Sequence, residues 1–238
     1  MRGKIGEVLW ISLMTRPDLA FDVNRLASKI PEATIKHIKE MNGVVKKAKS
    51  LNNIIRFSRL GPAEDLVVRV YTDASFKNRD NQVRSTEGRV IMLENPTSGK
   101  TGVLAWKTKK IPRVCRSVKT AETRALEDGL DEAIHIARIF KEVYNGSINL
   151  KSPDQLQVVA KIDSKSLWEN LHNTRQCEEK MLRSTIASIK ELMHLNNVKS
   201  VDWVPTDEQL ADCLTKKGTI AKSRWLLKVA EENNLFNI

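Results

Sequence analysis

The heptapeptide VYTDASF, residues 70–76, places an aspartate, Asp73, inside a stretch that otherwise has the pattern of a β-strand. Residues 66–70 before it are mostly apolar and β-branched, which is typical of a strand that packs against a core. A carboxylate buried there without a partner would cost several kcal/mol. Asp73 is therefore expected to be solvated, paired with a cation or bound to a metal, and its partners must come from elsewhere in the chain.

Five strand-like segments follow the turn signal Gly61-Pro62. They cover residues 66–76, 89–93, 103–107, 156–162 and 198–204, with turns at 78–82 and 95–102. A long helix is expected at 120–143, closed by Gly146, with shorter helices after 164, at 178–195 and after Thr206. The acidic face of the long helix is expected to be solvated surface. The sequence TDEQ, 206–209, fits a capping box in which Gln209 reaches back.

This order predicts the fold class. Three adjacent strands with hairpin-length turns should be antiparallel, and the later strands alternate with helices. We expect an α/β fold with a mixed five-stranded sheet and helices on both faces. A small helical segment precedes it.

Helical spacing also dominates both ends of the chain. Pro17 fits a first helical position, and a second helix has one apolar face, formed by Ile35, Ile38, Met41, Val45 and Ala48. Residues 220–236 predict a C-terminal helix. The expected division is a helical segment at 1–62, a core domain at 63–218 and a helical tail at 219–238.

The formal net charge of +11 favours a polyanionic partner, nucleic acid before membrane, although a generically basic protein would fit the charge as well. The stretch 106–120 contains no acidic residue. Its basic residues, Lys107, Lys109, Lys110, Arg113, Arg116 and Lys119, suggest a surface that faces phosphates.

The sequence contains no apolar run long enough to span a bilayer and no signal-peptide core, so we expect no membrane partner. Three scattered cysteines suggest reduced thiols rather than a zinc site. We therefore expect an intracellular protein, cytoplasmic or nuclear.

Four carboxylates could converge in the predicted fold: Asp73, Glu122 in the first turn of the long helix, Asp163 at the end of the fourth strand, and Asp212 after the fifth. Such a cluster repels itself unless cations lie between the carboxylates. Oxygen ligands suit Mg²⁺, with Mn²⁺ as an alternative, and a two-metal site could cleave a phosphodiester. Taken singly, each acid fits a cap, turn or surface residue equally well.

Local motifs decide between these interpretations. YTDAS (71–75), LAWKTKK (104–110), SVKTAETRAL (117–126), VVAKIDSKSL (158–167) and VPTDEQLADCLTKKG (204–218) occur in the order found in ribonuclease H domains of copia-type retrotransposon Pol polyproteins, which they resemble. LWISLMTRPDLAFDVNRLAS (9–28) resembles the end of the reverse transcriptase in the same polyproteins. No polymerase YxDD motif is present, so this chain alone is not predicted to be a reverse transcriptase.

The resemblance implies an endoribonuclease that hydrolyses the RNA strand of an RNA–DNA hybrid. Asp73 would bridge two Mg²⁺ ions, Asp212 would help to hold the ion that activates water, and Glu122 with Asp163 the ion at the leaving oxygen. The palm and fingers part of the same polyprotein is a further expected partner. Two alternatives stay open: a catalytically inactive nucleic-acid-binding or assembly module, and an integrase-like core.

Overall fold

The structure, a computed structural model, describes residues 1–50, 54–76, 84–145, 156–173 and 177–235. The predicted turn at 78–82, Gly146 and the end of the predicted tail helix at 236 lie outside this part. The α-helices are α1 (Arg2–Met14), α2 (Pro17–Ala27), α3 (Ile35–Ser50), α4 (Val118–Asn145), α5 (Lys165–His172), α6 (Arg183–His194) and α7 (Ile220–Glu232). The strands are β1 (Val67–Ser75), β2 (Thr86–Glu94), β3 (Thr101–Lys110), β4 (Gln157–Ile162) and β5 (Ser200–Trp203). Short 3₁₀ helices are η1 (Ile30–Glu32), η2 (Ala63–Asp65), η3 (Lys180–Leu182), η4 (Thr206–Glu208) and η5 (Leu210–Leu214).

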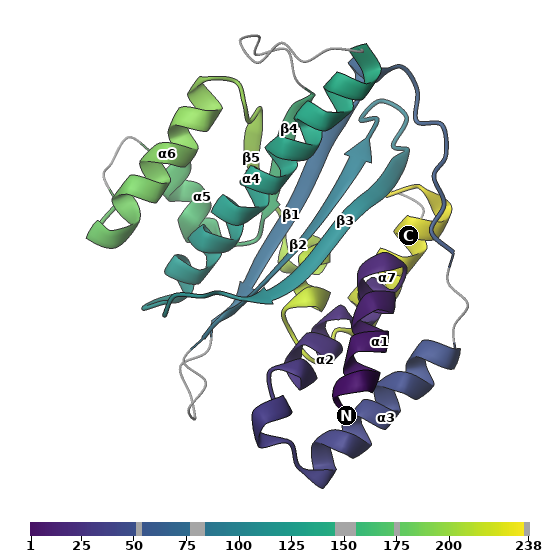
Figure 1. The fold of residues 1–238 in the computed structure, drawn as a ribbon. Coiled ribbons are helices and arrows are strands. Elements are labelled where there is room, and N and C mark those ends of the chain that lie inside the picture. The colour runs from purple at the N-terminus through teal and green to yellow at the C-terminus, as the bar shows by residue number, and fades with distance from the viewer. Residues whose placement is uncertain (51–53, 77–83, 146–155, 174–176, 236–238) are drawn as a thin grey trace.

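The strands form one mixed sheet in the order β3-β2-β1-β4-β5 (Figure 1). β1 pairs antiparallel with β2 and parallel with β4, so the strand that carries Asp73 lies at the centre of the sheet. β2–β3 is antiparallel and β4–β5 is parallel. This arrangement confirms the predicted fold class of a mixed five-stranded sheet with helices.

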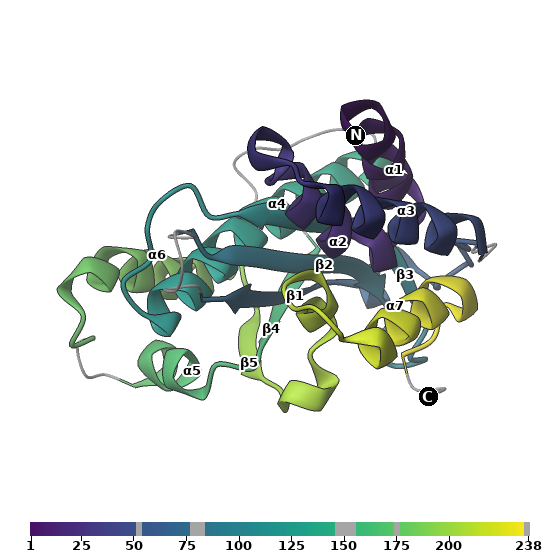
Figure 2. The ribbon, with the colours of Figure 1, turned by 90° about the horizontal axis from the view of Figure 1, so that it is seen from below.

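The two faces of the sheet are covered differently (Figure 2). On one face, Val68 and Val70 of β1 pack against the apolar stripe of α4, including Leu126 and Leu130, together with α5 and α6. On the other face, Tyr71 of β1 belongs to a second cluster, whose members from η5 and α7 include Leu210, Leu214, Leu226 and Val229. The period of two along β1 therefore assigns alternate side chains to two separate cores.

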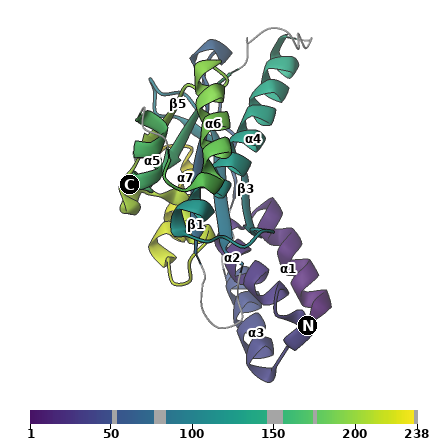
Figure 3. The same cartoon turned by 90° about the vertical axis from the view of Figure 1, so that its left-hand side faces the viewer.

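The N-terminal helices α1–α3 form a third cluster at one end of the molecule, away from α6 (Figure 3). Within the described residues, side-chain hydrogen bonds join them to β3: the Trp106 indole donates to Ser12 O at 2.7 Å, and the Asn24 amide donates to Thr108 O at 2.8 Å. The predicted apolar face of α3 is only half correct. Ile35 and Ile38 are 75% and 47% exposed, because the third cluster takes up α3 only from Met41 onward.

A buried ion pair links α2 to α3 in this third cluster. Arg16 donates to both carboxylate oxygens of Asp18, at 2.8 and 3.0 Å, and its guanidinium also donates to the carbonyls of Lys47 and Ala48. The ammonium of Lys47 lies 3.2 Å from Asp18 Oδ2. Asp18 is thus surrounded by positive charge inside a hydrophobic cluster.

Three local predictions are wrong. The segment after Thr206 forms η4 and η5 instead of a capped α-helix, and Gln209 donates to Thr72 O of β1 at 3.0 Å rather than reaching back to Thr206. The helix expected from residue 178 begins as η3 and becomes α6 at Arg183. The acidic face of α4 is not merely solvated, because Asp128 accepts from Lys109 of β3 and Glu132 pairs with Arg89 of β2.

Candidate metal centre

Asp73 is 1% exposed and lies on β1 directly opposite Gly88 of β2. A Cβ on Gly88 would lie 2.7 Å from Leu214 Cβ and 2.8 Å from Thr215 Cγ2, so only glycine lets the η5 segment approach the sheet here. This approach allows the Thr215 hydroxyl to donate to Asp73 Oδ2. Asp73 is therefore fixed by the sheet on one side and by the η5 segment on the other.

Glu122 reaches Asp73 from α4, on the opposite face of the sheet. The predicted position of Glu122 in the first turn of this helix is wrong. α4 begins at Val118, so Glu122 lies just beyond the first turn. Its Oε1 accepts from the backbone N–H of Ala74 at 3.3 Å. Further along the helix, Gly129 contacts β1 so closely that a Cβ there would lie 2.4 Å from Thr72 Cγ2. Close packing of α4 on β1 thus brings Glu122 to the level of Asp73.

Asp163 follows the last residue of β4, at the carboxyl end of the strand parallel to β1. It is half-buried, and its carbonyl accepts from the Trp203 indole N–H at 3.0 Å. Asp73, Glu122 and Asp163 each offer one carboxylate oxygen, and these oxygens all lie within 4.8 Å of one another. The structure therefore brings together three of the four predicted carboxylates.

The carboxylates of Asp73, Glu122 and Asp163, here called the triad, repel one another, and a bound cation would relieve this repulsion. Burial first, and then the charges of Asp212 and Asp163, raise the pKa of Asp73 to about 6, although Lys216 and Thr215 act against the rise. Burial, with Asp73 and Asp163 nearby, raises the pKa of Glu122 well above its usual value, and burial raises that of Asp163. Three crowded carboxylate oxygens are a ligand set that fits Mg²⁺ or Mn²⁺.

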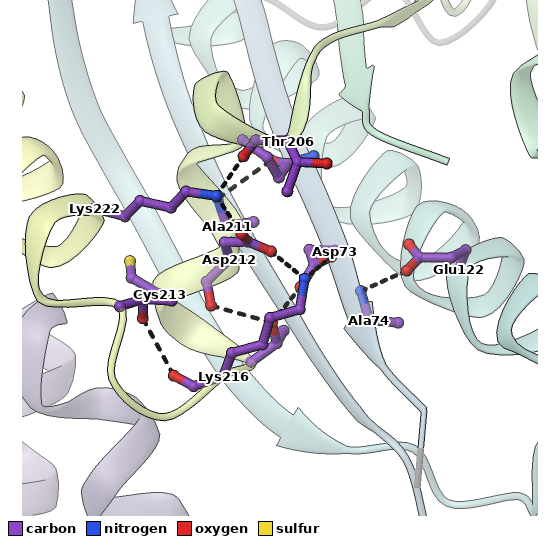
Figure 4. A network of polar contacts seen from close by, with 12 residues as sticks. Asp73, Ala74, Glu122, Thr206, Ala211, Asp212, Cys213, Lys216 and Lys222 are labelled. Carbon is purple, nitrogen blue, oxygen red and sulfur yellow. Dashed lines mark hydrogen bonds and ion pairs between the residues drawn. The ribbon is translucent and has the colours of Figure 1, made fainter. Parts of the chain in front are cut away.

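Asp212 lies next to this triad but has other partners (Figure 4). It is 3% exposed on η5, where Oδ1 pairs with the ammonium of Lys216 and Oδ2 with that of Lys222. Burial raises the pKa of Asp212, but the hydrogen bonds and charges of the two lysines outweigh it and hold the pKa below its usual value. The fourth predicted carboxylate is therefore buried beside the triad as the acceptor of two lysines.

Sequence reasoning missed both lysines, and it assigned Gln209 to a capping box instead of a bond to β1. Lys216 stands four residues after Asp212, a spacing that brings side chains together on one helical face, and this signal was available. Lys222 lies beyond a turn at Gly218, so only the docking of α7 reveals its contact. Gln209 is fully buried, accepts from Ala211 N and donates to Thr72 O, and thereby attaches η5 to β1.

The predicted basic stretch runs from the end of β3 to the start of α4. Lys107, Arg113 and Arg116 are exposed, and Lys110 and Lys119 are half-exposed. Lys109 is half-exposed as well, and its ammonium pairs with Glu87 and Asp128.

No protein-family model matches the chain. The chain is 26% identical over 221 residues to the retrovirus-related Pol polyprotein from transposon RE1 of Arabidopsis thaliana, and 27% identical over 221 residues to that from transposon RE2. Both matches cover 90% of this chain and 14% of the polyprotein, so the chain spans a small part of these relatives. It is also 28% identical over 131 residues to secreted RxLR effector protein 161 of Plasmopara viticola, covering 55% of this chain and 86% of that protein. The predicted similarity to retrotransposon Pol polyproteins is confirmed.

Among solved structures, the N-terminal RNase H domain of rv2228c from Mycobacterium tuberculosis resembles the chain with a TM-score of 0.45 and 20% identity, over 67% of this chain and 97% of that one. LC11-RNase H1 in complex with an RNA/DNA hybrid has a TM-score of 0.43 and 18% identity, over 62% and 92%. Within the described residues, no helix combines the length and apolar character needed to cross a bilayer.

Proposed function

We propose that the chain is a Mg²⁺-dependent ribonuclease H domain that hydrolyses the RNA strand of RNA–DNA hybrids. The observation that carries this proposal is the triad: three acids from three different elements, with ligand oxygens within 4.8 Å of one another in a largely buried setting. Like charges so close together destabilise a fold. A functional reason for retaining them is the binding of divalent cations.

Each residue of the site would have a distinct role. Asp73, Glu122 and Asp163 would hold the cation, which supplies charge stabilisation to a phosphodiester and lowers the pKa of a bound water. The central position of Asp73 in the sheet keeps its carboxylate rigid. Trp203 fixes the backbone at Asp163 through its indole N–H, and Thr215 orients Asp73. Rigid placement matters because cation-assisted cleavage depends on geometry at the reacting atoms.

The finer proposal of two ions requires Asp212 as a ligand. Asp212 is close enough to raise the pKa of both Asp73 and Asp163 through its charge. Its oxygens are engaged by Lys216 and Lys222, so a divalent ion bound to Asp212 would compete with these ammonium groups. The second of the two proposed ions would therefore bind in competition with Lys216 and Lys222.

Substrate binding would use basic residues that lie between the end of β3 and the first turn of α4. They are Lys107, Lys110, Arg113, Arg116 and Lys119. Basic side chains on a surface bind the phosphates of a hybrid regardless of sequence. The similarity to Pol polyproteins supports a reverse transcriptase part, palm and fingers, as an additional partner. The proposed division remains a segment at 1–62 that resembles the end of a reverse transcriptase, a nuclease domain at 63–218 and a tail at 219–238.

The test is cleavage of a labelled RNA–DNA hybrid with Mg²⁺. We expect Asp73→Asn and Glu122→Gln to lose activity by on the order of a thousandfold, because removing a ligand forfeits several kcal/mol of charge stabilisation. Asp128→Asn is the matched control, since Asp128 lies on α4 with Glu122 but pairs with Lys109. Hybrid binding without metal-dependent cleavage by the unaltered chain would refute the enzyme and favour the binding module.

A further inference from the structure

Lys216 has a place in the metal centre that the proposed function leaves unexplained. We propose that its ammonium is a built-in competitor for the second divalent cation, occupying the space between Asp73 and Asp212 until that ion displaces it. This inference rests on the metal-binding part of the proposed function and deepens it. It concerns the order and strength of ion binding rather than the reaction.

The geometry of Lys216 supports this role. Its Nζ lies 3.5 Å from Asp73 Oδ1 and is also paired with Asp212 Oδ1. In Figure 4 its side chain extends across the gap between these two carboxylates. By the resemblance to ribonuclease H domains, Asp73 and Asp212 would be the acids that hold a second ion. One ammonium and one ion of like charge cannot occupy the same gap.

The triad can receive a first ion without displacing Lys216. The close-lying ligand oxygens belong to Asp73, Glu122 and Asp163, and Asp212 is not part of that set. A first ion would therefore use these oxygens while Lys216 stays on Asp212. The positive charge of Lys216 would weaken the binding of the first ion from a distance. The second ion would in addition have to displace the Lys216 ammonium.

Lys216 and Lys222 differ in how easily they can leave. The Lys216 side chain is 41% exposed and lies between the end of η5 and Gly218, whose φ of +87° turns the chain towards α7. The Lys222 side chain is only 17% exposed, projects from α7 and also donates to the carbonyl of Thr206. Lys216 can therefore turn into water, while Lys222 stays attached to Asp212 and the η4 segment.

The experiment counts bound Mn²⁺ on the full chain by the electron paramagnetic resonance signal of the free ion. For the unaltered protein we expect two classes of site with well-separated affinities. Lys216→Met should strengthen the weaker class tenfold or more and leave the stronger class within about threefold. Lys216→Arg, which keeps the charge, should preserve the separation.

Lys222→Met is the matched control. It removes the same charge and also one ion pair with Asp212, but within the described residues it is Lys216, not Lys222, that forms the ion pair with Asp73. We expect a clearly smaller gain in the weaker class than for Lys216→Met. Equal gains from both variants would mean that net charge alone sets the affinity, and this would overturn the proposal.

Failure of this inference can be told apart from failure of the proposed function. Two classes of Mn²⁺ site that do not respond to Lys216→Met would overturn the competitor role alone. A chain that binds no Mn²⁺, with Asp73→Asn behaving identically, would overturn both. Circular dichroism of each variant checks that the fold is intact, which the exposure of Lys216 leads us to expect.

Discussion

Asp18 and Asp73 are both buried aspartates, 5% and 1% exposed, yet their surroundings act on them in opposite directions. Burial raises the pKa of Asp18, but Arg16 and Lys47 outweigh it and hold the pKa below its usual value. At Asp73 burial and neighbouring acids prevail, and the pKa rises to about 6. The first aspartate is neutralised by its own neighbours, whereas at the second the Lys216 ammonium is outweighed by burial and by the neighbouring acids. Burial alone therefore does not distinguish a structural carboxylate from a functional one.

The largest expected effect tests this contrast through stability. Asp18→Ala should cost about 3–5 kcal/mol of unfolding free energy, because it leaves the buried Arg16 guanidinium without its carboxylate. Asp73→Ala, measured in a chelator, should cost far less, since it also relieves repulsion within the triad. Urea unfolding of the two variants measures both quantities. Equal losses would mean that Asp73 is as much a structural residue as Asp18.

The second test concerns what holds Asp73 in place. Gly129→Ala should lower the unfolding free energy by about 3 kcal/mol, because the new methyl overlaps Thr72 and forces α4 away from β1. Cleavage should fall with it, since Glu122 is on the same helix. Thermal unfolding and the hybrid assay measure the two effects.

Gly43→Ala provides the control, because a Cβ on this glycine of α3 meets no atom within 4 Å. It should raise stability by up to about 1 kcal/mol through helix propensity. A Gly129→Ala protein as stable as Gly43→Ala would show that α4 does not hold the site through this contact.

A smaller effect is expected on the opposite face of the sheet. Gln209→Ala should cost about 1–2 kcal/mol, because Thr72 O and Ala211 N would lose their buried partner. The cleavage rate should also fall, by more than the loss of folded protein explains, because η5 loses its attachment beside Asp73. Glu208→Ala, at the exposed neighbouring position, should stay within about 0.5 kcal/mol of the unaltered protein. Equal behaviour of the two variants would exclude Gln209 as an anchor.

The smallest effect is a pH dependence. The pKa of Asp18 is lower in the folded chain than the usual 3.8, so its contribution is complete above that value and is lost as the pH falls through the folded pKa. The stability difference between the unaltered protein and Asp18→Asn should therefore shrink below about pH 4. Urea midpoints at pH 3 to 7 measure it. A difference that stays constant across this range would contradict the assigned ion pair.

The sequence was sufficient for the sheet and for the triad. The apolar, β-branched run before Asp73 predicts β1, and the order of strands and helices makes a meeting of acids at the carboxyl ends of strands possible; the ordered motifs then favour it. Asp73 and Asp163 could thus be placed together before any coordinates. Glu122 could be placed because a long apolar stripe fixes the face of α4 that packs on the sheet.

The region around Asp212 could not be predicted in the same way. Local signals at Thr206 favour a capping box, but the buried amide of Gln209 bonds to β1 and Thr215 bonds to Asp73, and these long-range bonds impose the 3₁₀ geometry of η5. Likewise, α3 has a helical stripe, but its exposed start at Ile35 depends on how far the third cluster extends. Tertiary contacts between distant residues decide both features.

The position of Lys222 on α7 bears on the order in which the centre is completed during synthesis. A chain made from its N-terminus contains the three triad acids, and later Asp212, before α7 exists. The Asp212 carboxylate then keeps its ion pair with Lys216 but lacks the one with Lys222, and η4 lacks its bond from Lys222 to Thr206 O. Because domains generally fold as units and α7 packs in one core cluster with η5 and β1, we expect the acidic cluster to become ordered only when α7 docks. Docking of α7 therefore completes both a core cluster and the charge balance at Asp212, so a chain interrupted before residue 222 would lack both bonds of Lys222.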